Sequence, residues 1–144
     1  MGTWGMKAFE SDDSMDWVAE LEQSSDGSAV RQALTAAAGT SAEEYLEAPD
    51  GQIAIAAAEV VAAAASGAAD DLPEEVRAWL TANGASVAGD VELATRAVAR
   101  VIATTNSELR DLWSVDDGAD PADIAAWESH VADLQRRLAE SAAA

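Results

Sequence analysis

Gln52-Ile-Ala-Ile-Ala-Ala-Ala-Glu59-Val-Val-Ala-Ala-Ala-Ala65 is the stretch that decides the fold. Wound as a helix, it is apolar on most of its circumference and carries Glu59 on the remaining face. A helix that is apolar nearly all round is usually central, and small Ala side chains let neighbouring backbones approach it. We therefore predict a helix over about 52–65 in the middle of a bundle, covered by Trp and Leu side chains from other helices.

Outward from this stretch, apolar residues recur at helical spacing almost everywhere, and alternation of the strand type is missing. The pattern predicts an all-α fold: a compact single-domain bundle of about six helices over residues 1–140, with 141–144 as a frayed tail. The expected helices lie at about 12–23, 28–38, 52–65, 73–82, 90–104 and 120–140, with a short helical piece after Asn106 or Ser107.

Start and stop signals set the expected boundaries. Asp120-Pro121 begins the last helix with an N-cap and a proline at its first position, and Pro73 takes the same first position in the fourth helix. Gly39 is placed to end the second helix as its C′ residue. Ala48-Pro49-Asp50-Gly51 is expected to end a short helical or turn segment that holds Tyr45 and Leu46, because a residue before proline is pushed out of the α region.

The last predicted helix carries an apolar seam with the 3, 4, 3, 4 spacing of a heptad repeat. Its members are Ile124, Trp127, Val131, Leu134 and Leu138. We expect this seam to pack within the bundle, and the sequence leaves open whether the protein is a monomer or a homodimer. The alternative is a homodimer that pairs these helices.

Aromatic residues gather at the N-terminus, where Trp4, Phe9 and Trp17 fall within the first seventeen residues. Termini are usually disordered unless something ties them down, and Trp is a costly residue to leave exposed. We predict that these three side chains dock the N-terminal segment onto the bundle. Trp79, Trp113 and Trp127 complete this structural signature and are expected to fill volume that Ala-rich helices leave open.

Charge restricts the possible partners. Eight Lys and Arg against 27 Asp and Glu give a net charge of −19. Nucleic acid is disfavoured, because binding its backbone requires cations. The acidic surplus favours a basic protein partner; the competing interpretation is solubility, genome composition or salt adaptation.

Two acidic patterns are candidates for metal binding. Asp12, Asp13 and Asp16 have the Asp-Asp-x-x-Asp spacing with which isoprenoid synthases hold Mg²⁺. At a helix N-terminus the same acids satisfy free N–H groups and the helix dipole, and we expect that role.

Glu43, Glu44 and Glu47 match half of the Glu-Glu-x-x-Glu signature of all-α nucleotide pyrophosphohydrolases, whose partner motif is missing. His130 is the only histidine, so a two-His metal site cannot form. It lies beside the seam, where we expect an ordinary flank position. We predict no metal, no cofactor and no catalytic residues.

The start of the chain lacks an apolar signal segment, and the chain has no cysteine. These features favour the cytoplasm, without disulfides. No stretch has the length and composition of a membrane span.

Several segments carry a family resemblance: Met1-Gly2-x-Trp4-Gly5-x-x-x-Phe9, Asp16-Trp17, Tyr45-Leu46-Glu47-Ala48-Pro49-x-Gly51, Leu72-Pro73-Glu74-Glu75-Val76-Arg77-Ala78-Trp79-Leu80 and Ser107-Glu108-Leu109-Arg110-x-Leu112-Trp113. Together they resemble the bacterial family catalogued as domain of unknown function 4259. The resemblance covers nearly the whole chain and implies one domain and a bacterial cytoplasmic origin. It implies no activity, cofactor or catalytic residue.

Two functions from different classes follow. The first is a non-enzymatic acidic helical protein that binds a basic protein, in the manner of a small immunity or antitoxin protein. The alternative is a Mg²⁺-dependent phosphate-ester or nucleotide hydrolase that uses the acidic clusters near the N-terminus.

Overall fold

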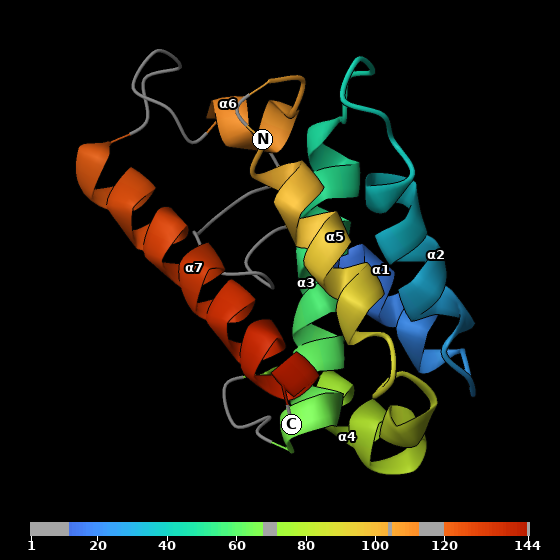
Figure 1. Ribbon diagram of the computed structural model, residues 1–144. Coiled ribbons are helices and arrows are strands. Elements are labelled where there is room, and N and C mark those ends of the chain that lie inside the picture. Colours follow the sequence, from blue (N-terminus) through green and yellow to red (C-terminus); the bar gives the residue numbers. More distant parts are fainter. Residues whose placement is uncertain (1–11, 68–71, 104, 113–119, 144) are drawn as a thin grey trace.

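Helix α3 (Ala48–Ser66) runs through the middle of the molecule, and the other helices are arranged around it (Figure 1). The computed structural model describes residues 12–67, 72–103, 105–112 and 120–143. Besides α3, its helices are α1 (Asp12–Glu22), α2 (Ser28–Ala38), α4 (Glu74–Asn83), the 3-10 turn η1 (Gly84–Ser86), α5 (Val91–Val101), α6 (Glu108–Leu112) and α7 (Pro121–Ala143). Within these residues the only β-type pairing is a single bridge between Leu46 and Ser107. The predicted all-α class is confirmed.

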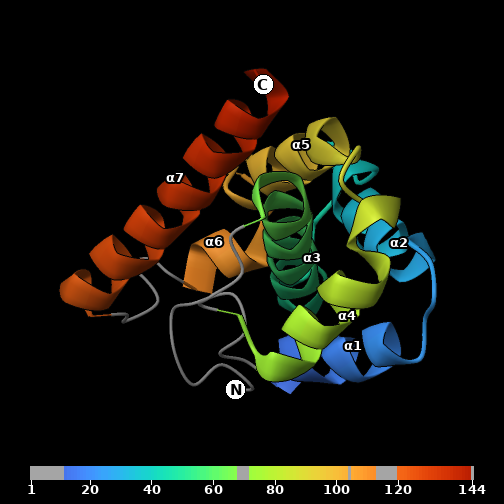
Figure 2. The same cartoon turned by 90° about the horizontal axis from the view of Figure 1, so that it is seen from below.

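The central position of α3 is also as predicted. Every residue from 54 to 63 is buried, and α3 contacts each of the other six α-helices (Figure 2). The narrow Ala side chains allow this, because neighbouring helices come close on several sides at once. None of the described helices combines the length with the apolar character that crossing a bilayer requires.

The start of α3 differs from the prediction. Ala48, Pro49 and Gly51 form its first turn and do not end a preceding segment. Proline is tolerated in a first turn, where its missing N–H would have no helical partner. The Ala48 N–H is instead capped from outside the helix by the Glu108 carboxylate, at 2.8 Å. Sequence spacing did not reveal this cap, because it lies 60 residues away.

Other helix ends agree to within a residue or two. Asp120 caps α7 by accepting the Ala122 N–H at 2.8 Å, as predicted. Pro73 is the N-cap of α4 and not its first helical residue. Gly39 follows α2 directly but is right-handed (φ −84°), whereas the left-handed helix end is Gly67 after α3 (φ 80°).

The heptad seam of α7 packs inside the chain. Trp127, Val131, Leu134 and Leu138 are buried, and α7 lies against α3 and α5. Ile124, the first member of the seam, is only half-buried. The helix continues to residue 143, beyond the expected end of the ordered domain at 140.

The tryptophans that can be described lie in the core, as expected. Trp17, Trp79 and Trp127 are each 4% exposed. The Trp79 Nε1–H donates to the Ser24 carbonyl at 2.9 Å, so the polar edge of this ring also has a partner. Trp4, Phe9 and Trp113 lie outside the described residues, and the docking of the N-terminal segment stays a prediction.

Candidate functional site

The first acidic pattern lies on the outer side of α1. Asp12 and Asp16 are exposed and Asp13 is half-buried, whereas Trp17 and Leu21 of the same helix face the core. Asp12 and Asp13 occupy the first turn, where the helix dipole favours negative charge.

The second pattern is not helical. Glu43, Glu44 and Glu47 are exposed in the loop between α2 and α3, where they lack the fixed spacing of a helix face. Glu44 accepts the Ser41 N–H of its own loop at 3.3 Å. Nowhere in the described part of the chain do three or more His, Asp or Glu side chains form a group that could hold a metal ion.

Two polar side chains from outside this loop hold it in place by bonding to its backbone carbonyls. The Arg100 guanidinium donates to the carbonyls of Thr40 (3.0 Å), Ser41 (3.2 Å) and Glu44 (2.6 Å). The Asn106 side chain adds a bond to Ala42 at 2.7 Å. The partners of Arg100 are about 60 residues away in sequence, so no local pattern could reveal them.

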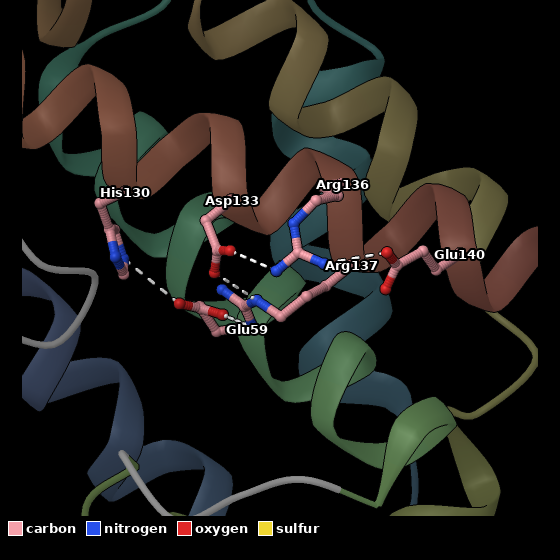
Figure 3. Close-up of polar contacts among 6 residues, drawn as sticks. All are labelled: Glu59, His130, Asp133, Arg136, Arg137 and Glu140. Carbon is pink, nitrogen blue, oxygen red and sulfur yellow. Dashed lines mark hydrogen bonds and ion pairs between the residues drawn. The ribbon is translucent and has the colours of Figure 1, made fainter.

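The most unusual polar group is Glu59, which is 4% exposed in the otherwise apolar middle of α3. Two side chains of α7 reach it (Figure 3). His130 Nε2 lies 3.2 Å from Glu59 Oε2, and Arg137 Nη1 lies 2.7 Å from Glu59 Oε1. His130 and Arg137 are seven residues apart and so occupy the same face of α7, two turns apart.

The charge of Glu59 is stabilised in spite of its burial. Burial alone raises the pKa of a carboxyl group, but the contacts with His130 and Arg137 outweigh it and lower the pKa of Glu59. The pKa of Arg137 is raised: burial opposes its charge, and the carboxylates of Glu59 and Asp133 more than compensate. Glu59 and Arg137 therefore stabilise each other in their charged forms.

The pair continues to the surface of α7. Arg137 Nε lies 2.8 Å from the Asp133 carboxylate, which also pairs with Arg136. Arg136 in turn reaches Glu140 at 2.9 Å. The result is a chain of alternating charges that begins at the buried Glu59 and ends in solvent (Figure 3).

The prediction for His130 needs correction, because it is not an ordinary flank residue. It lies against a buried carboxylate and is itself only 20% exposed in its side chain. One local signal could have indicated the cluster: a lone acid in an apolar helix needs a cation, and His130 and Arg137 share the same side of the seam. The seam also explains their position, since its burial brings this face of α7 down onto α3.

These observations define the class: an all-α protein built around an Ala-rich helix, with one buried carboxylate paired to a peripheral helix. The chain belongs to the family described as Domain of unknown function (DUF4259), which matches residues 2–138. This family is the one that the sequence segments resemble. No curated protein and no solved structure matches the chain.

Proposed function

We propose that this protein acts by binding a basic protein partner, as small immunity and antitoxin proteins do, and that α1 provides the contact. Support comes first from composition, since the net charge is −19. A surface of one sign accelerates the encounter with an oppositely charged partner.

The observation that carries the proposal is the charge on α1. The helix holds five acids and no basic residue; we call Asp12, Asp13, Asp16, Glu20 and Glu22 the acidic face. Among the described residues none of these carboxylates is in an ion pair. Acids of α7, by contrast, are paired with arginines.

Helix capping accounts for only part of this face. Asp12 and Asp13 are in the first turn, where the helix dipole favours acids. Glu20 and Glu22 are at the opposite end, where it disfavours them. Asp12, Asp16 and Glu20 also follow one another at i, i+4, a spacing that is unfavourable for like charges. Stability of the helix therefore does not explain these residues, and this supports the proposal that they contact a partner.

Neighbouring elements extend the same charge. Helix α4 packs against α1, and its first turn presents the exposed acids Glu74 and Glu75 (Figure 2). Asp26 lies exposed in the loop that follows α1.

Affinity capture from a lysate of the source cell tests the proposal. The test variant is Asp16→Asn/Glu20→Gln/Glu22→Gln. The matched control, Glu43→Gln/Glu92→Gln/Asp123→Asn, removes the same charge from exposed positions elsewhere. We expect a basic protein that the wild type and the control retain at low salt, that high salt releases and that the α1 variant does not retain. Equal retention by both variants would refute the role of α1.

Calorimetric titration with Mg²⁺ separates this function from a metal-dependent hydrolase. A binding protein gives no stoichiometric heat, and Asp13→Ala and Glu44→Ala change nothing. A site that either substitution abolishes would favour the hydrolase instead.

A further inference from the structure

Helix α7 is the peripheral element of the fold. It is the C-terminal helix, and its extensive contacts are with α3 and α5 (Figure 1). Helices α1, α2, α4 and α5 contact α3 independently of it. The structure therefore permits α7 to leave while the other helices remain packed on α3.

The face of α3 beneath α7 offers little shape to hold a partner in place. Between residues 54 and 63 the whole circumference of α3, this face included, consists of Ala, Val and one Ile, apart from Glu59. The heptad seam of α7 is periodic, so an apolar surface of this kind accepts it in more than one register. Something other than apolar packing must select one alignment.

Glu59 provides that selection. Among the described residues, the basic side chains within ion-pair distance of Glu59 are His130 and Arg137, both from α7, and no side chain of α1, α4 or α5 lies within such a distance. An offset of α7 by one turn would place Asp133 or Ser141 where Arg137 now lies. Either offset leaves the buried carboxylate without its guanidinium, and a buried unpaired charge is strongly unfavourable.

We propose that Glu59, His130 and Arg137 form a charge latch: while the buried carboxylate is paired, α7 is docked in one register, and when the pairing is lost α7 separates from α3 and α5 as a unit. Separation uncovers the apolar faces of both helices. The latch is thus a conformational device distinct from the acidic face of α1.

Neighbouring arginines supply a matched test. Arg137→Met removes the guanidinium that reaches Glu59. Arg136→Met removes an equal charge one residue away, from a side chain that is 57% exposed and pairs only with surface acids. Hydrogen exchange with mass spectrometry compares α7 with α2, which contacts α3 and α5 but has no extensive contact with α7.

In Arg137→Met we expect the amides of α7 to exchange about 100-fold faster or more, while those of α2 change far less. Arg136→Met leaves both helices near wild type. Glu59→Leu/Arg137→Met, which removes both buried charges, restores protection in α7.

Three results would overturn the latch: equal effects of the two arginine substitutions, acceleration spread evenly over α2 and α7, or no recovery in the double variant. Should Arg137→Met not fold, Arg137→Lys decides the matter. This variant keeps a cation but loses the planar fork that spans Glu59 and Asp133. Faster exchange confined to α7 supports the latch, and any other pattern refutes it.

Discussion

Helices α1 and α7 both lay an apolar stripe on α3, yet they treat their charges in opposite ways. In α7 the arginines bridge Asp133, Glu140 and the buried Glu59. In α1 there are five acids and no basic residue; four of the acids are exposed and Asp13 is half-buried. Charged side chains of α7 thus hold this helix to α3, whereas the acids of α1 form no ion pair among the described residues. Charge on α7 is paired within the fold, whereas the proposed function assigns the charge on α1 to a partner.

Both helices bury an apolar side, and removing a large side chain from either apolar side has the largest expected effect on stability. Trp17 in α1 and Trp127 in α7 are equally buried. Trp17→Ala and Trp127→Ala should each lower the free energy of unfolding by about 3–5 kcal/mol, measured by urea denaturation. Tyr45→Ala, at a position 52% exposed, serves as the control. A loss below about 1 kcal/mol for Trp127→Ala alone would mean that α7 is not docked as described.

The next largest expected effect concerns the pairing of α7 with Glu59, whose contribution to the free energy of unfolding depends on pH. Because the pKa of Glu59 is lowered in the folded protein, its charge stabilises the fold above the ordinary glutamate pKa, and this contribution is lost as pH falls through the lower folded value. Glu59→Gln should cost about 1–3 kcal/mol near neutral pH, and progressively less as the pH falls below the ordinary glutamate pKa of about 4.3. Unfolding curves across that range test this, with exposed Glu92→Gln as the control. A cost of Glu59→Gln independent of pH would contradict the charged pairing.

A smaller effect is expected at the surface of α7. The hydrogen bond from Arg136 favours the charged form of Asp133 more than burial opposes it. Arg137 adds to this effect, so the pKa of Asp133 is lowered. Asp133→Asn should lower the free energy of unfolding by about 0.5–1 kcal/mol. Asp16→Asn on α1 removes an equal charge that forms no ion pair within the described part of the chain, and it should cause no loss. Equal losses would remove the distinction between the two helices.

Sequence alone predicts much of the fold, because its strongest signals are local. The apolar circumference of 52–65 predicts the central helix, and Asp120-Pro121 predicts the start of α7. The seam predicts which face of α7 is buried. The spacing of residues cannot reveal contacts between residues that are distant in the sequence. One example is the cap that Glu108 provides for Ala48, where α3 begins four residues before its predicted start.

The polar sites follow the same rule. The positions of Asp12 and Asp13 at a helix start are predictable, since only neighbouring residues decide them. The pairing of Glu59 with His130 and Arg137 depends on how α7 crosses α3, which no one-dimensional pattern specifies. In the Glu43-Glu44-x-x-Glu47 motif a local pattern is misleading. Its spacing is typical of a helix, but Arg100 holds the segment as a loop through contacts that are distant in the sequence.

The central claim is that the carboxylates of α1 are kept for a partner and not for the fold. The unfolding free energy of Glu20→Gln/Glu22→Gln at low salt tests it most directly. We predict a gain of about 0.3–1 kcal/mol over the wild type, because two acids that form no ion pair with any described residue leave the end of a helix whose dipole disfavours them, and the gain should shrink at high salt. A loss of stability would show that these acids serve the fold, and would contradict the account.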